Sequence, residues 1–319
     1  MSEPGPSTSQ AEASTDIDVE AATLLSKGRS FLLKDDAPNA VQNLQEACEL
    51  LGSKYGELAK ECGECYYYYG WALLELARLE NDVLGNALDG VPEDEDTDQA
   101  TTSADKPDNV EDPEKVDSDN EGEGDAGEED GDEDDAKGAE AASAEEQDDE
   151  DISNFQLSWE MLELARIIFS QQEGDEFTLK VSQVYLKLGE LGLERGNYAQ
   201  SVDDFTLCLK TQTEQLSKDS RLLAETHYNL ALAYSFDQKF DKAIENFELS
   251  TNMIQNRITM LENKPTEGRT DEELAQDQKE IKELKALIPE IKLKIDDAKA
   301  EKNTLESAVG QALRSASAE

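Results

Sequence analysis

A spacing of twelve residues between small side chains recurs along this chain and constrains its fold more than any other feature. The small pairs are Gly28 with Ala40, Gly189 with Ser201, and Ala231 with Ala243. Apolar residues accompany each small residue at helical intervals of three and four. A regular pattern of this kind predicts a helical hairpin that is repeated along an all-α solenoid.

The pattern matches the tetratricopeptide template, W-x2-L-G-x2-Y followed by A-x3-F, four times. The matching positions are Leu24, Lys27, Gly28, Phe31, Ala40, Leu44 and Ala47 in the first repeat, Tyr185, Leu188, Gly189, Gly192, Ser201, Phe205 and Cys208 in the third, and His227, Leu230, Ala231, Tyr234, Ala243, Phe247 and Ser250 in the fourth.

The second repeat is interrupted. Its first half contains Gly70, and its second half resumes at Ser158, which lies 88 residues later instead of twelve. The stretch from residue 93 to 151 carries 29 acidic residues and three lysines, so it holds more than half of the chain's net charge of −46. A flexible insertion in a hairpin turn costs little, about 0.6 kcal/mol per doubling of loop length. We therefore predict one hairpin that is split by a disordered acidic loop.

The predicted domain plan follows from these breaks. It places a disordered N-terminus at 1–17, repeat 1 and the first helix of repeat 2 at 18–87, the disordered insert at 88–153, the second helix of repeat 2 with repeats 3 and 4 at 154–262, a capping helix at 270–303 and a disordered tail at 304–319.

A long helix is expected after the fourth repeat. Pro265 and Gly268 break the chain, and Thr270 with Glu273 forms a capping box. One apolar stripe then follows: Leu274, Ile281, Leu284, Ile288, Ile291, Ile295 and Ala298. A solenoid needs such a helix to cover its last repeat, and Pro289 would kink a continuous coiled coil. The cap is favoured, and a coiled-coil homodimer is the alternative.

The composition restricts the partners. A polyanion repels nucleic acid and anionic lipid and attracts basic proteins, so we expect no direct nucleic-acid partner. The sequence has no stretch of 18 apolar residues, so no membrane span is expected. The N-terminal residues lack an apolar run, and four cysteines without secretory features indicate a reducing compartment.

A binding groove is predicted on the first helices of the hairpins, at positions one residue beyond the template positions. This surface combines aromatic and aliphatic side chains with carboxylates, which suits a helix or an extended segment that carries basic residues. Part of the set is expected to pack against neighbouring hairpins instead. The predicted groove residues are Glu64, Tyr67, Trp71, Glu75, Leu186, Glu190, Leu193, Glu194, Glu225, Tyr228, Leu232 and Phe236.

No catalytic, cofactor or metal site is predicted. Cys62 and Cys65 form a C-x-x-C pair within a helical pattern, without the strand that a redox motif needs. Residues 117–128 match an EF-hand loop in part but lack its flanking helices. The single histidine, His227, stands at a packing position of the template. We interpret the chain as a binding protein and not as an enzyme.

The interrupted second repeat resembles that of the interrupted-tetratricopeptide histone chaperones. The segments that carry the resemblance are ARLENDVLGNAL before the insert, LSWEMLELARIIF after it, LLAETHYNLALAY in repeat 4, and IPEIKLKIDDAK in the long helix. The resemblance implies binding of core histones three and four, with the helical part of histone three in the groove. It also implies linker histone and other histone chaperones as further partners, and a nuclear location with a cytoplasmic pool. The family's basic import stretch has no match at LRSASAE, so the nuclear expectation rests on the resemblance.

Two functional hypotheses follow. In the first, the groove holds a histone while the insert shields its basic surface; we assign this shielding to Glu128, Glu129, Asp130, Asp132, Glu133, Asp134, Asp135, Asp148, Asp149, Glu150 and Asp151. In the second, the repeats form a scaffold for an unrelated basic peptide and the insert is a solubilising spacer. Removal of the insert distinguishes the two.

Overall fold

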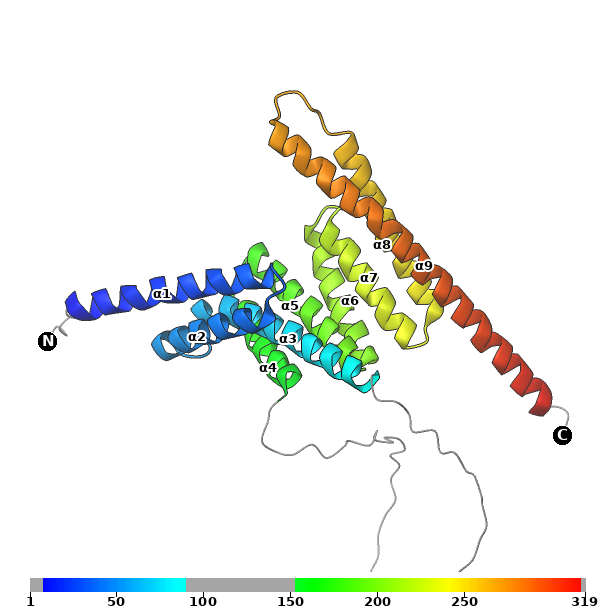
Figure 1. Cartoon of the computed structure of the whole chain (residues 1–319), viewed down its shortest axis with the longest axis horizontal. Helices are drawn as coiled ribbons and strands as arrows, with labels where there is room; N and C mark the ends of the chain where they lie inside the picture. The colour runs from blue at the N-terminus through cyan, green and yellow to red at the C-terminus, as the bar shows by residue number, and fades with distance from the viewer. Residues whose placement is uncertain (1–7, 90–152, 317–319) are drawn as a thin grey trace, which may run out of the picture. The chain divides into compact units, whose positions relative to one another are not determined.

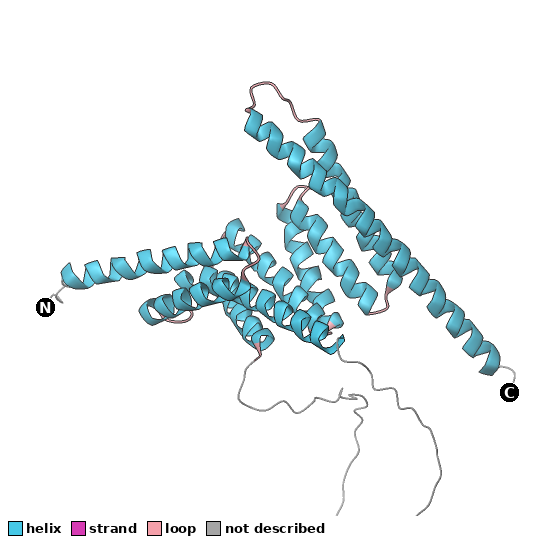
Figure 2. Ribbon diagram, viewed as in Figure 1, coloured by secondary structure: helices cyan, strands magenta, loops and turns pink. Residues whose placement is uncertain are grey.

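The structure is a computed structural model that describes residues 8–89 and 153–316. Every regular element in these two ranges is a helix (Figure 1, Figure 2). The helices are α1 (Thr8–Leu32), α2 (Ala37–Tyr55), the short 3-10 helix η1 (Lys60–Cys62), α3 (Gly63–Asp89), α4 (Asn154–Ser170), α5 (Asp175–Glu194), α6 (Tyr198–Gln215), α7 (Arg221–Phe236), α8 (Phe240–Glu262) and α9 (Asp271–Ala316). The predicted acidic residues from Glu128 to Asp151 lie outside the described residues.

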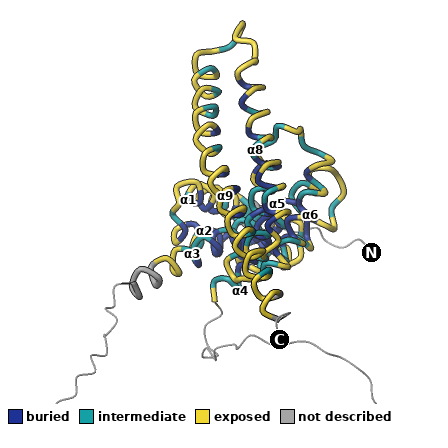
Figure 3. The backbone as a smooth tube through the Cα atoms, turned by 90° about the vertical axis from the view of Figure 1, so that its right-hand side faces the viewer, coloured by how far each residue is buried: buried dark blue, intermediate teal, exposed yellow. Residues whose placement is uncertain are grey.

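Consecutive helices pack as the predicted hairpins. Helix α1 packs on α2, α5 on α6, and α7 on α8, and neighbouring hairpins meet through α4 with α5 and through α6 with α7. The described part of the chain is thus an all-α array of tetratricopeptide-like hairpins. Figure 3 shows the buried residues on the surfaces where helices face one another, whereas α9 is exposed along most of its length.

Each hairpin crosses closely at its small residue. A Cβ atom placed on Gly28 would lie 2.4 Å from Cγ of Leu44, and one placed on Gly189 would lie 2.5 Å from the Phe205 ring. These distances are far below a van der Waals contact, so only glycine allows the large residue of the partner helix to pass. The template spacing therefore reflects a steric requirement at these two crossings, while the fourth hairpin has a small alanine, Ala231, at the same position.

The split second hairpin is present. A Cβ atom on Gly70 would lie 2.8 Å from Cγ of Leu162, and Ser158 Oγ donates a 2.7 Å hydrogen bond to the Gly70 carbonyl. Further along, Asn154 Nδ2 donates to Glu80 Oε2 at 2.8 Å. Contacts therefore move backward along α4 as they move forward along α3, which is the antiparallel order of a hairpin. The prediction of an interrupted second repeat is confirmed.

Helix α9 packs along α8 through the predicted stripe. Leu284, Ile291 and Ile295 are buried in one cluster with residues of α8. The predicted capping box is present: Thr270 N–H donates to Glu273 Oε2 at 2.9 Å, and Glu273 N–H donates to Thr270 Oγ1 at 3.2 Å. The predicted capping helix is confirmed.

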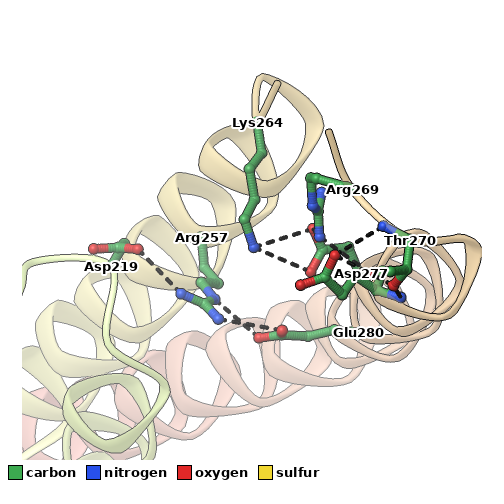
Figure 4. A network of polar contacts seen from close by, with 8 residues as sticks. Asp219, Arg257, Lys264, Arg269, Thr270, Asp277 and Glu280 are labelled. Atoms are coloured by element: carbon green, nitrogen blue, oxygen red, sulfur yellow. Dashed lines mark hydrogen bonds and ion pairs between the residues drawn. The ribbon is translucent and has the colours of Figure 1, made fainter. Parts of the chain in front are cut away.

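Ion pairs hold the start of α9 against the end of α8 (Figure 4). Arg257 Nε donates to Glu280 Oε1 at 2.9 Å, and its Nη1 lies 3.5 Å from Asp219. Arg269 lies 2.6 Å from Asp277. These contacts join the turn after α8 to the first turns of α9, so the long helix is fixed at its N-terminal end as well as along its stripe.

Two ends of the predicted plan differ from the structure. Helix α9 passes through Pro289 and continues beyond residue 303 to Ala316, where a disordered tail was expected. Helix α1 begins at Thr8, within the predicted disordered N-terminus. Both extensions reach beyond the predicted apolar pattern, and each contains alanine, glutamine and glutamate, residues that favour helix without a core contact. The packed stripe on both sides of Pro289 holds the two halves of α9 in one helix.

Candidate binding groove

The predicted groove residues come from the first helices α3, α5 and α7, and the aromatic ones on α3 form a cluster. The Tyr67 and Tyr68 rings meet edge to face with centroids 5.0 Å apart, and Tyr68 stacks on Trp71 at 6.1 Å. Two cations lie on this cluster: the Arg29 guanidinium is 4.7 Å from the centre of the Tyr68 ring, and Lys187 Nζ is 4.6 Å from that of Trp71. Tyr68 and Lys187 were not in the predicted set.

Most of the predicted carboxylates are neutralised by cations of the chain itself. Arg78 Nη1 lies 3.0 Å from Glu75, its Nη2 3.3 Å from Glu190, and its Nε 2.7 Å from Glu194. Burial alone would lower the pKa of Arg78, but the three carboxylates raise it. Arg78 therefore bridges α3 and α5, and these acids are less free for a basic ligand than predicted.

The pair of Lys187 and Glu190 lies deeper. The two groups are 2.9 Å apart, and each side chain is about one-tenth exposed. A buried charge without a partner costs several kcal/mol, on the order of 3–5. Lys187 is thus a structural counter-ion of Glu190. A fourth cation, Lys180, contacts Glu64 at 2.8 Å and Glu176 at 2.9 Å.

Glu225 on α7 differs from the other predicted acids. It forms no ion pair with any residue in the described ranges, and burial followed by the nearby Glu190 raises its pKa, against an opposing effect of Lys187. The residue as a whole is exposed, and it lines a hollow among α7, α8 and α9. Burial, Tyr68, Glu190 and Glu225 raise the pKa of Tyr67, so α3, α5 and α7 meet near this group.

Two separate hollows hold four of the predicted residues. One, of about 360 Å³, lies between the α1–α2 turn and α3 and is lined by Trp71, Glu75 and Arg78. The other, of about 350 Å³, lies among α7, α8 and α9 and is lined by Glu225, Tyr228 and residues of α9 that include Leu287 and Glu290. The contribution of α9 to this second hollow was not predicted.

Several predicted residues have packing roles. Leu186 is buried in a core cluster with Phe205 and Cys208, and Leu193 packs against the same cluster. Tyr228 contacts the Phe247 ring at a centroid distance of 5.5 Å, and Leu232 packs against the cluster shared by α8 and α9. These side chains stabilise the hairpins whether or not they also touch a ligand.

Phe236 lies apart from the aromatic cluster. It ends α7, is 55% exposed, and stacks on Tyr198 with centroids 5.1 Å apart. A hollow beside it is lined by residues of the C-terminal half of α9, including Thr304 and Leu305. The structure thus does not bring Phe236 together with the α3 aromatics.

Other chemistry is limited in the described residues. No group of three or more histidine, cysteine or acidic side chains there is arranged to hold a metal ion. Cys62 and Cys65 are buried in the core, and burial raises the pKa of Cys62 to about 11. No helix in the described ranges has the length and the apolarity that crossing a membrane requires.

Comparison with known proteins assigns the family. A tetratricopeptide-repeat family model matches residues 180–256. Protein HGV2 of Halocynthia roretzi is 36% identical, with 97% of this chain and 76% of that protein covered. Histone-binding protein N1/N2 of Xenopus laevis is 30% identical over 79% of this chain and 70% of its own length. Protein NASP homolog 1 of Caenorhabditis elegans is 34% identical over 87% of this chain and 70% of its own length. The split hairpin and these likenesses together show that the chain belongs to the NASP (nuclear autoantigenic sperm protein) family of interrupted-tetratricopeptide proteins.

Proposed function

We propose that this chain is a nuclear histone chaperone that binds histone three, alone or with histone four, in its groove and shields the histone with the acidic insert for nucleosome assembly. The relatives named above include a histone-binding protein and support the general role. Linker histone and other histone chaperones are proposed as further partners, and a cytoplasmic pool is proposed beside the nuclear one. No nucleotide or other cofactor is required.

The observation that carries this proposal is the attachment of the insert. Asn154 is bonded to Glu80, so both ends of the insert start from the same end of the α3–α4 hairpin. The insert contributes 29 carboxylates between residues 93 and 151. A half-buried aromatic cluster on α3, formed by Tyr67, Tyr68 and Trp71, belongs to the same hairpin, and such a surface suits an amphipathic helix. A histone bound there would thus have a polyanion tethered beside it.

The mechanism follows from competition between polyanions. Free histones bind DNA mainly through basic side chains, and salt weakens such contacts. A tethered insert acts at a high effective concentration on any basic surface within its reach. It would cover the histone without a fixed geometry and would release it when a tighter acceptor, such as DNA in a nucleosome, takes the same charges.

The decisive experiment changes the charge of the insert and keeps its length. In one variant residues 93–151 are replaced by an uncharged glycine-serine linker of equal length, and in a matched control the same residues are shuffled. Affinity for labelled histone three–four complex is measured by fluorescence anisotropy over a series of salt concentrations. We expect the neutral linker to weaken binding and to reduce its salt dependence, while the shuffled insert retains both.

The alternative function is a repeat scaffold that recruits an unrelated basic peptide, with the insert as a spacer. In that case the neutral linker would bind histone as tightly as the parent chain at every salt concentration. Circular dichroism of each variant checks that the helices are intact. Equal binding by all three chains would refute shielding by the insert.

The groove is tested separately through Glu225. Glu225→Gln keeps the size of the side chain and removes the carboxylate that lacks an ion pair. Tyr228→Ala is less suitable, because Tyr228 contacts Phe247 and its loss would also weaken the core. Leu207→Ala on α6, where Leu207 is 43% exposed, serves as the control. We expect weaker capture of a histone three fragment by Glu225→Gln alone; equal capture by both variants would remove Glu225 from the site.

A further inference from the structure

A further hollow, on α4, α5 and α6, is separate from those described above. Its volume is about 310 Å³, roughly ten times the ~30 Å³ that a water molecule occupies in the liquid. Trp159 and Leu188 line it, and Asp204 lies at its α6 wall. Leu188 and Glu190 are two residues apart, so they point about 160° away from each other around α5. The hollow therefore opens on the face of α5 opposite to Glu190 and the α3 aromatics.

The α6 wall holds a buried carboxylate without a cation partner. Asp204 is 6% exposed and accepts one hydrogen bond, from Gln200 Nε2 at 3.3 Å. No ion pair to Asp204 forms within the described ranges. Burial raises its pKa to about 6, and Glu163 across the hollow adds to this effect, whereas the hydrogen bond from Gln200 and the charge of Arg166 oppose it. A buried carboxylate of this kind is costly and gains strongly from a cation that reaches it.

The other charged groups around the hollow do not supply that cation. Arg166 is held by Glu163, with Nη2 2.7 Å from Oε2 and Nε 3.0 Å from the same oxygen. Arg195 is an exposed residue of the rim at the end of α5, with no ion pair among the described residues. Asp203, next to Asp204, adds a further negative charge.

The rim carries an exposed indole. Trp159 on α4 is 45% exposed, a large fraction for the largest apolar side chain. Exposed tryptophans at the edge of a hollow are frequent anchors of protein interfaces. Leu188 and Leu191, both buried, form an apolar wall beside it. The hollow thus combines a flat aromatic face, an apolar wall and two carboxylates: Glu163, which is paired with Arg166, and Asp204, which has no ion pair among the described residues.

We propose that this hollow binds an arginine side chain from a basic segment of a partner protein. The aliphatic stem would lie along Leu188 and Leu191, and the guanidinium would donate to Asp204. The indole of Trp159 would stack on the guanidinium, a contact that arginine makes better than lysine. Residues 1–7, 90–152 and 317–319 contain no arginine, so those segments of the chain cannot supply one.

The chain's two tryptophans give a direct test, because Trp71 lies at the groove and Trp159 at this hollow. The full chain, labelled with nitrogen-15 in its indoles, is titrated with N-acetyl-arginine amide, and the two indole N–H signals are followed by NMR. The matched neutral probe is N-acetyl-citrulline amide, in which a urea replaces the guanidinium. Trp159→Phe assigns the two signals.

We expect the arginine probe to shift the Trp159 signal and the citrulline probe to leave it unchanged. Asp204→Asn should abolish the shift while the Trp71 signal keeps its position, which shows that the fold is intact. Arg195→Gln should leave the shift in place or enlarge it, since Arg195 repels a cation at the rim.

Three results would overturn the proposal: an equal shift with citrulline, an undiminished shift in Asp204→Asn, or a shift of Trp71 alone. The last would indicate a cation site in the groove only. The two tryptophan signals report on opposite faces of α5, so the two proposals are tested independently. A negative result at Trp159 would not contradict the proposed histone-binding groove. Likewise, if Glu225→Gln does not weaken histone capture, the proposed arginine site is not contradicted.

Discussion

Replacement of Gly70 by alanine tests the packing of α3 on α4 across the insert. A Cβ atom at this position would lie 2.8 Å from Cγ of Leu162 and 3.1 Å from the backbone nitrogen of the same residue. The leucine side chain is fully buried and has little room to move. The backbone nitrogen belongs to α4, so relief of that contact requires a shift of the whole helix.

The expected magnitude is a balance of two effects. Alanine stabilises a helix interior by about 1 kcal/mol relative to glycine, whereas overpacking of a filled core costs about 1–3 kcal/mol. Because one contact is with backbone, we expect the cost at the upper end and a net loss of about 2 kcal/mol in the free energy of unfolding. Gly52 is the matched control: its added Cβ would meet only Tyr66 Oη at 3.7 Å, an ordinary contact. Gly52→Ala should stabilise the protein by about 1 kcal/mol.

The assay is urea unfolding followed by circular dichroism. A double-mutant cycle with Leu162→Ala completes it, since Leu162→Ala removes the two clashing side-chain atoms. Gly70→Ala should be milder in that background, with a coupling energy of about 1 kcal/mol and incomplete rescue because the backbone contact remains. If Gly70→Ala proves as stabilising as Gly52→Ala, α3 and α4 do not cross at this point and the split hairpin is wrong.

Three further predictions concern single side chains. Asp204→Asn should change the pH dependence of stability, because the pKa of the carboxyl is near 3.8 in the unfolded chain and about 6 in the folded one. As the pH rises from ~4 to ~6, the free energy of unfolding of the parent chain should fall by up to about 3 kcal/mol, whereas that of the variant should not. Urea unfolding of both chains over this pH range measures the difference. Arg78→Met leaves Glu190 with one cation instead of two and should cost about 3 kcal/mol in the free energy of unfolding. Lys302→Met should cost much less, because its partner Asp241 is exposed. Equal midpoints of urea unfolding for the two variants would contradict this difference. Thr270→Ala removes the capping box and should cost about 1 kcal/mol, with Thr270→Ser as the control that retains it.

The crossings of the hairpins could be predicted from the sequence because they depend on local spacing. Gly28 and Gly189 each precede their second-helix partner by a fixed interval, and the same steric rule identified Gly70 with Leu162 across the insert. The available volume at a close helix crossing requires a small residue, whatever the length of the chain between the two helices. The pattern can therefore be recognised on both sides of the insert.

The groove could be predicted only in part. The prediction took the residues one position beyond the template positions as groove residues, and this assumes that each helix has one exposed face. Helix α5 is buried on nearly all sides: the seven residues from Leu186 to Gly192 are all buried. The position of a residue around α5 therefore does not show whether it belongs to the core or to the surface. For this reason Leu186 was predicted in the groove, although it belongs to the core.

The ion pairs of Arg78 were also beyond the sequence, because they join residues 112 and 116 positions apart. One local signal was present, since Arg78 follows Glu75 by three residues and Trp71 by seven, on the same helix face. Nothing local indicated that Glu190 and Glu194 would come to the same guanidinium.

These internal cations alter how the proposed chaperone would use its charge. Three cations of the chain neutralise the carboxylates between α3 and α5: Arg78 pairs with Glu75 and Glu194, Lys187 with Glu190, and Lys180 with Glu64. The charge of this surface is therefore much less negative than its glutamates alone would make it. Under the proposed function the groove would then hold a histone mainly through Tyr67, Trp71 and the single carboxylate of Glu225, contacts that salt weakens little. The long-range attraction would come from the insert, whose carboxylates have no such partners in their own sequence beyond three lysines. Salt should therefore weaken the insert's contribution to histone affinity and leave that of the groove almost unchanged. The parent chain and the neutral-linker chain should differ most in affinity at low salt and bind histone about equally at high salt.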